Sequence, residues 1–91
     1  GYTEDEKLEI AKRHLMKKQF EDHGLKDDEL TISDDALRAV VQLYTREAGV
    51  RSLEREIAKI ARKTVTAIVS GQQKSVSVTP ENLEEYALDL L

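Results

Sequence analysis

The stretch from Tyr44 to Arg55, YTREAGVRSLER, constrains the fold most, because it ends one helix and begins another across a single glycine. Gly49 is expected to end the first helix in the left-handed conformation, which glycine enters without a steric penalty from Cβ. Ser52 is a candidate N-cap for the next helix. Arg51 therefore lies within about one turn of a helix N-terminus, where unpaired backbone N–H groups favour anions. Two interpretations stay open: a phosphate-binding arginine and an ordinary solvated arginine.

The chain has 91 residues, enough for one small domain with a modest core, so residues 1–91 are expected to form a single domain. Its 40% apolar and 35% charged composition, with one proline and four glycines, is typical of a helix-rich globular protein. There is no cysteine, and neither a secretion leader nor an apolar run of membrane length is present. We therefore expect a cytoplasmic protein. The start without methionine suggests a domain excised from a longer chain.

A first helix is expected over residues 4–22. Thr3 and Glu6 form a capping box, in which each side chain bonds the backbone N–H of the other residue. Gly24 follows the last helical residues and should end the helix.

The apolar residues of this first helix divide between two faces. Ile10 lies about 200° around the helix from Leu8, given the 3.6-residue period. It is therefore either an ordinary exposed apolar residue or part of a second contact surface. The stripe expected to face the core consists of Leu8, Ala11 and Leu15.

Two further helices are expected in the middle of the chain. Ser33 should cap the first of them, with acidic residues in its first turn where negative charge suits the helix dipole. The second should run from about Arg51 to Ser70 and end at Gly71. The expected buried faces are Leu37, Val40, Val41 and Tyr44 on one helix, and Leu53, Ile57, Ile60, Thr64 and Ile68 on the other.

Two short apolar segments are expected to form strands. Residues 30–32 (LTI) and 75–78 (SVSV) are each too short to stand alone, so we expect them to pair in parallel across the intervening helices. Thr79 and Pro80 then resemble an N-cap and a first helical residue, opening a last helix to about Leu88.

A basic middle segment is the one feature of the composition with binding potential. Residues 36–75 carry eight Lys or Arg and three Asp or Glu, whereas residues 1–35 carry six and eleven. One interpretation is a solvated face, held by pairs such as Glu47 with Arg51, and Glu56 with Lys59 or Lys63. The other is contact with phosphates, either of a nucleotide or of a nucleic-acid backbone, and contact with duplex DNA would be weak and salt-sensitive. The residues that would make that contact are Arg55, Lys59, Arg62 and Lys63.

Catalytic and metal-binding motifs are absent from the sequence. It contains no P-loop, no HExxH and no nucleophile elbow. His14 and His23 lack a spaced partner, so no metal site is expected. The 91 residues are therefore not expected to be an enzyme by themselves.

Two long segments resemble a known family. The segments GYTEDEKLEIAKRHL (1–15) and YTREAGVRSLEREIAKIARK (44–63) closely resemble the small helical subdomain of the bacterial type of Lon, the ATP-dependent AAA+ protease family. The resemblance implies a mostly α fold, a four-helix AAA+ lid subdomain with a short two-stranded parallel sheet. The family commonly reads HLLPKQ where this chain has HLMKKQ at residues 14–19, and loss of the proline favours a continuous first helix.

The resemblance also implies a role for particular residues. Arg51 occupies the position of the sensor-2 arginine, which contacts the phosphates of ATP. Tyr2, Ile10 and Val50 match positions that line the base side of the nucleotide. The chain would then be a nucleotide-sensing lid, with ATP and Mg²⁺ held largely by the adjacent large subdomain.

The resemblance implies that the remaining ATPase and protease elements lie elsewhere in a longer parent chain. The resemblance implies partners in the large AAA+ subdomain and in a protease domain with a Ser-Lys dyad, and assembly into a hexameric ring. Family members are also associated with DNA binding, so the lid role and the alternative of a DNA-binding module do not exclude each other.

Overall fold

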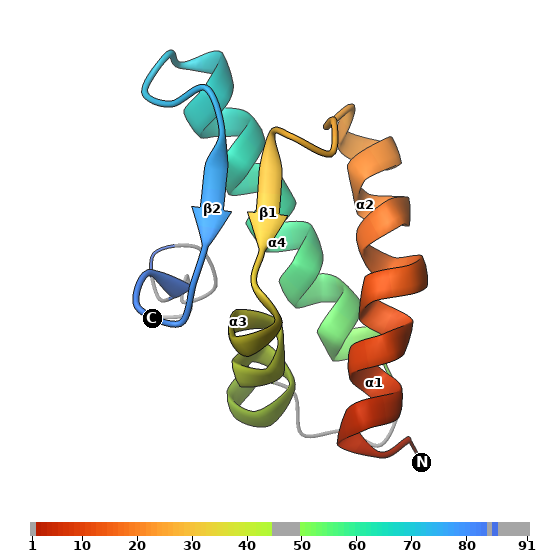
Figure 1. Ribbon diagram of the computed structural model, residues 1–91. Helices are drawn as coiled ribbons and strands as arrows, with labels where there is room; N and C mark the ends of the chain where they lie inside the picture. Colours follow the sequence, from red (N-terminus) through yellow and green to blue (C-terminus); the bar gives the residue numbers. More distant parts are fainter. Residues whose placement is uncertain (1, 45–49, 84, 86–91) are drawn as a thin grey trace.

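The computed structural model describes residues 2–44, 50–83 and 85 (Figure 1). It is mostly helical and contains one small parallel sheet, as the sequence predicts. The elements in order are α1 (Glu4–Ile10), η1 (Ala11–Leu15), α2 (Met16–His23), β1 (Leu30–Ile32), α3 (Asp34–Ala39), η2 (Val40–Tyr44), α4 (Arg51–Val69) and β2 (Val76–Val78).

The first helical body is continuous from α1 through η1 to α2 (Figure 1). The predicted capping box is present, with both reciprocal hydrogen bonds between Thr3 and Glu6. Gly24 ends the body in the left-handed conformation, at φ 68°. The sequence did not predict η1, a stretch of π-helix inside this body.

The second helical body, α3 with η2, begins as predicted. The Ser33 hydroxyl accepts a hydrogen bond from the backbone N–H of Ala36 at 3.0 Å, and two aspartates occupy the first turn. Leu37, Val40 and Val41 are buried, which confirms three members of the expected face. The side chain of Tyr44 lies outside the described part of the structure.

Helix α4 begins differently from the prediction. Its N-cap is Val50, whose carbonyl accepts from the N–H of Glu54 at 2.9 Å, so the prediction of Ser52 as the cap is wrong. The helix starts before Ser52, which therefore has a helical backbone and cannot take the extended conformation of a capping residue. The predicted left-handed Gly49 lies outside the described residues.

The end of α4 agrees with the prediction. Ser70 is the C-cap, and Gly71 follows it at φ 81°. Backbone hydrogen bonds from Gly71 to Ile68 and from Gln72 to Ala67, both at 3.1 Å, satisfy carbonyls of the last turn.

The sheet pairs β1 with β2 in parallel, with Leu30 opposite Val76 and Ile32 opposite Val78. This confirms the predicted pairing. In each strand the two outer residues are buried and the central residue is exposed, so one face of the sheet contacts the core. Two three-residue strands persist here because their apolar face packs on the helices.

One hydrophobic core joins all the helical bodies and the sheet. Helix α4 packs against α2, η1 and η2, and α1 packs against α3 and η2. Ile10 packs against this core and is half-buried, so the interpretation of an ordinary exposed residue is wrong. The core-facing members of α1, η1 and α4 include Leu8, Ala11, Leu15, Leu53, Ile57, Ile60 and Thr64, as predicted, whereas Ile68 is only half-buried.

The described residues form three helical bodies rather than the four predicted. The expected last helix covered residues 80–88; residues 80–82 form a turn instead, and residues 84 and 86–88 lie outside the described part of the chain. Its beginning is partly visible: the Asn82 side chain accepts from the N–H of Thr79 at 2.7 Å, and Leu83 is buried. Among the helices described, none is both long and apolar enough to cross a membrane.

Candidate functional site

Arg51 is the first residue of α4, and it is exposed. Within the described part of the chain, its guanidinium makes no hydrogen bond or ion pair. Val50 precedes it at φ −120° and ψ 8° and offers no side-chain capping hydrogen bond. A cation thus stands beside the positive end of a 19-residue helix, an arrangement that can hold an anion between side chain and backbone.

The interpretation of Arg51 as a helix-pairing residue named two partners. Glu47 lies outside the described residues. Glu54, the one acidic residue in the first turn of α4, instead binds Lys18 of α2, with 2.9 Å between Oε2 and Nζ. The structure therefore gives Glu54 a partner from another helix.

The three apolar residues predicted for the base side occupy two different settings. Val50 and Ile10 are half-buried and pack against the core, whereas Tyr2 is 49% exposed just before α1. The N-terminal ends of α1 and α4 both lie toward the lower right of Figure 1. Tyr2 precedes α1 and Arg51 begins α4, so both belong to these helix beginnings, whereas Ile10 is the last residue of α1.

An ion-pair network fixes the start of α1 to α3. Arg38 binds Glu4 at 2.8 Å and Asp5 at 3.3 Å, and Gln42 also donates to Glu4 at 3.0 Å. These bonds, that from Arg38 first, lower the pKa of the Glu4 carboxyl below its ordinary value. Hydrogen bonds from Thr3 likewise lower the pKa of Glu6. The acidic residues at the beginning of α1 are therefore bound by partners within the domain.

The basic residues predicted to contact DNA lie on α4 but differ in their partners. Arg55 and Arg62 are exposed beside Lys59, and the three border a hollow of about 230 Å³. Lys59 binds the buried Glu56 at 2.9 Å, which confirms that predicted pair, and Lys63 donates to the carbonyl of Glu85 at 3.1 Å. No aromatic residue stands among them to stack on bases.

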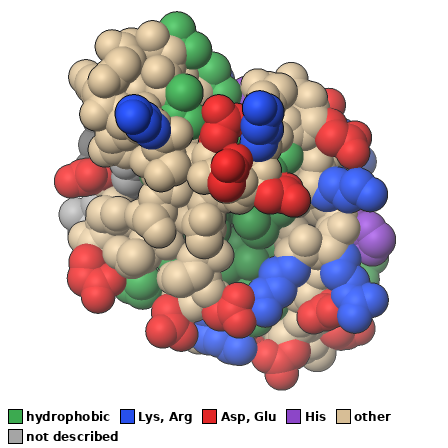
Figure 2. All heavy atoms as spheres, turned by 45° about the horizontal axis from the view of Figure 1, so that its top comes forward, with side chains coloured by type: hydrophobic (Ala, Val, Ile, Leu, Met, Phe, Trp, Pro, Cys, Tyr) green, Lys and Arg blue, Asp and Glu red, His purple; other side chains and the backbone are tan. Residues whose placement is uncertain are grey.

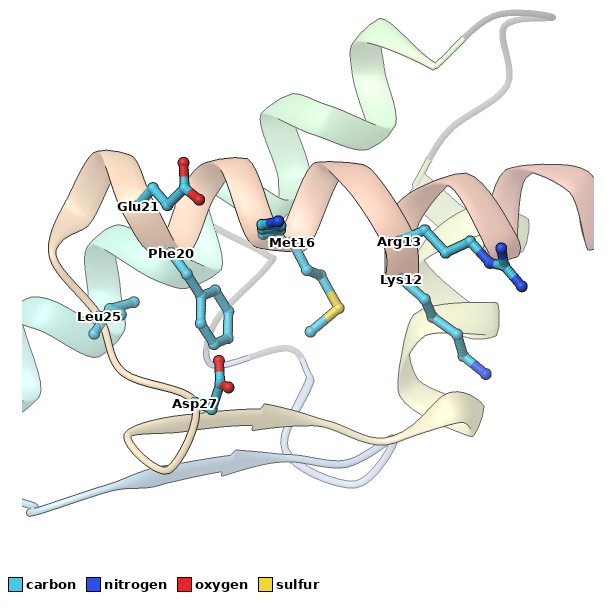
Figure 3. A pocket seen from close by; sticks show the side chains of 8 residues that line it. Lys12, Arg13, Met16, Phe20, Glu21, Leu25 and Asp27 are labelled. Carbon is cyan, nitrogen blue, oxygen red and sulfur yellow. The ribbon is translucent and has the colours of Figure 1, made fainter.

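Another hollow, of about 430 Å³, lies beside η1 and α2 (Figure 3). Met16, Phe20 and Leu25 form its apolar side, and its rim mixes basic with acidic side chains. Two of the basic residues have partners, Lys12 with Asp34 at 2.9 Å and Arg13 with Glu9. Figure 2 shows the same mixture of charges across the face that it draws, so that face presents no broad surface of one sign.

Metal ligands are not gathered anywhere in the described ranges: no three His, Asp or Glu side chains there are arranged to hold an ion.

Comparison with known proteins identifies the domain. A family model described as the Lon protease AAA+ ATPase lid domain matches residues 21–76, more than half of the chain. The chain belongs to the Lon lid family. This confirms the resemblance carried by residues 44–63, which lie within the matched segment. Residues 1–15 precede that segment.

Known Lon proteases are similar to this chain over nearly its whole length. The Lon protease of Brucella abortus is 59% identical over 86 residues, and that of Azospirillum brasilense is 61% identical over 89 residues. These matches cover 94% and 96% of this chain, yet the chain spans only 11% of the length of either relative.

A solved structure supports the fold of the lid. The Bacillus subtilis Lon protease SSD domain matches with a TM-score of 0.72 at 52% identity. The match covers 94% of this chain and 90% of that one.

Proposed function

We propose that this domain is the nucleotide-sensing lid of a Lon-like ATP-dependent serine protease, and that Arg51 contacts the phosphates of ATP. The observation that carries the proposal is the position of Arg51 in a member of the Lon lid family. It is exposed at the first residue of α4, and its guanidinium has no partner among the described residues.

The four residues named by the resemblance have the chemistry to bind a nucleotide. A planar guanidinium presents several donors that match phosphate oxygens, and the positive end of α4 adds to the attraction. Val50 and Ile10 offer apolar surface backed by the core, and Tyr2 offers an exposed ring that can cover a base. ATP, with Mg²⁺, would supply the energy of hydrolysis, and these four residues would bind and orient it.

The adjacent large AAA+ subdomain would hold most of the nucleotide, so the lid acts by differential contact. A lid shifts a conformational equilibrium only if it binds the ATP and ADP states with different free energies. In the longer chain its partners would be the large subdomain, the protease domain and neighbouring copies in a hexameric ring. Its setting would be cytoplasmic.

Mutation of Arg51 in the full-length chain tests the proposal. Arg51→Ala should lower kcat/KM for ATP about tenfold to a hundredfold, because it removes a charge-assisted hydrogen bond. Proteolysis that depends on ATP should fall with it. Arg51→Lys should recover little, since lysine lacks the planar fork. Arg13→Ala is the matched control. Arg13 is exposed, it pairs with Glu9, and both residues lie in the first helical body rather than on α4.

A thermal melt separates this role from a structural one. Arg51→Ala should change the free energy of unfolding by only about half a kcal/mol, as for a surface substitution. A variant that is clearly destabilised yet hydrolyses ATP normally would contradict the proposal.

The alternative of DNA binding through α4 stays a prediction with weaker support. Arg55 and Arg62 remain exposed, but Lys59 and Lys63 are engaged within the domain. Of the four predicted contacts, two cations would have to leave internal partners, or share them, to reach a phosphate.

A further inference from the structure

The first turn of α4 places a carboxylate where it could neutralise Arg51. Arg51 and Glu54 are three residues apart on one helix, a spacing that puts their Cβ atoms about 5–6 Å apart on the same face. Opposite charges at this spacing attract each other, although the pair is stronger when the acid precedes the base. The exposed Arg51 would be its natural partner.

In the structure Glu54 binds elsewhere. Its Oε2 lies 2.9 Å from Nζ of Lys18, which reaches it from α2. Helices α2 and α4 pack directly on each other, and Leu53, the neighbour of Glu54, is fully buried. Packing therefore fixes the distance between the two backbones that carry the pair.

The charges and exposure of the two side chains agree with pairing of Glu54 with Lys18 rather than with Arg51. The hydrogen bond to Glu54 raises the pKa of Lys18, and Asp22 adds a smaller contribution in the same direction. The carboxylate of Glu54 is the less exposed partner, with a side chain 30% exposed against 61% for Lys18. Glu54 thus has less access to water and depends more on its protein partner.

From this geometry we infer that Lys18 is a positioning residue: it holds the carboxylate of Glu54 and thereby keeps the guanidinium of Arg51 available to phosphate. The inference rests on the proposed function of Arg51. Lys18 does not touch the nucleotide. Its role is to remove a competing acceptor at the start of α4.

Four variants of the full-length chain test the inference through the KM for ATP. Lys18→Met should raise KM about two- to fivefold, the range expected when one exposed ion pair competes for Arg51. Glu54→Gln should not raise KM, because it removes the competitor. The double variant Lys18→Met/Glu54→Gln should return to within about twofold of the parent. Lys17→Met removes the same charge one residue away and should leave KM unchanged.

The pattern of KM values separates competition for Arg51 from a purely structural ion pair and from an effect of total charge. If the ion pair merely fastened α4 to α2, Glu54→Gln would raise KM as much as Lys18→Met, and the double variant would not recover. If total charge governed binding, Lys17→Met would match Lys18→Met. Either result overturns the inference.

Arg51→Ala, measured beside these variants, distinguishes the inference from the proposed function. In the Arg51→Ala background, Lys18→Met should have no further effect on KM, which would support competition for Arg51. If Arg51→Ala leaves ATP hydrolysis unchanged, the proposed function and the inference both fail. If Arg51→Ala impairs hydrolysis while Lys18→Met does not, only the inference fails.

Discussion

Helices α1 and α4 begin in opposite ways. The first turn of α1 has three acidic residues and a reciprocal capping box, and Arg38 of α3 binds two of those acids. The first turn of α4 has an arginine, no capping side chain on Val50, and one acid that binds another helix. At the N-terminal end of α1, the capping residue and the acidic side chains therefore have partners within the domain. The N-terminal end of α4 instead has an exposed positive charge.

Helix stability does not account for this difference. A cation at a helix N-terminus opposes the macrodipole and costs about 0.3–1 kcal/mol at an exposed site. The start of α1 follows the dipole and the start of α4 goes against it. Such an exception is expected if Arg51 serves the proposed contact with phosphate rather than the stability of α4.

The largest expected effect contrasts the two sides of the first turn of α4. Leu53 is fully buried, so Leu53→Ala should cost about 2–5 kcal/mol of unfolding free energy through lost burial and a residual cavity. Arg51→Ala, two residues away, should cost about a tenth to a quarter of that. Urea unfolding of the two variants measures the ratio. Equal losses would show that Arg51 is structural after all.

The next effect contrasts a capped helix with α4. Ser33→Ala should destabilise the domain by about 1 kcal/mol, because the N–H of Ala36 loses its acceptor. Val50→Ser should give no matching gain. Ser33 has an extended backbone at ψ 156°, whereas Val50 has ψ 8°, so a hydroxyl at position 50 would not be aimed at the next turn.

Thermal melts of both variants check this pair. A stabilised Val50→Ser would mean that α4 lacks only a suitable side chain, and the two helix beginnings would then differ in sequence but not in backbone geometry.

The smallest expected effect is a loss of stability at acidic pH. The pKa values of Glu4 and Glu6 are lowered in the folded state, so their contribution to stability is complete above the unfolded value near 4.5. It is lost as the pH falls through the lower folded values. The unfolding midpoint in urea should therefore decline below about pH 4.5. Glu6→Gln should flatten this decline, and an unaltered slope would contradict the assignment.

Local signals account for the part of the fold that could be predicted. The capping box at Thr3, the cap at Ser33 and the glycine stops at Gly24 and Gly71 depend on neighbours within a few residues, and all were predicted. The parallel strands followed from their length and from the helices between them. The cap at Ser52 was wrong because composition alone does not show where the chain enters α4.

The ion pair between Lys18 and Glu54, on which our inference about Lys18 rests, was less predictable because it is not local. Lys18 and Glu54 are 36 residues apart, and no periodic pattern joins them. They meet because α2 packs on α4, a fact that belongs to the tertiary structure. The position of Arg51 could be predicted, but the partner of its neighbour could not.

The pairing of β1 with β2 has a consequence for synthesis. All of α3, η2 and α4 lies between the two strands, so closing the sheet requires ordering a long segment first. Val76 and Val78 emerge from the ribosome after α3, η2 and α4. Until then Leu30 and Ile32, which are 2% and 7% exposed in the finished domain, have no strand beside them. Until residues 76–78 are made, the nascent lid would therefore carry an open strand edge at β1, the kind of edge that invites wrong pairing.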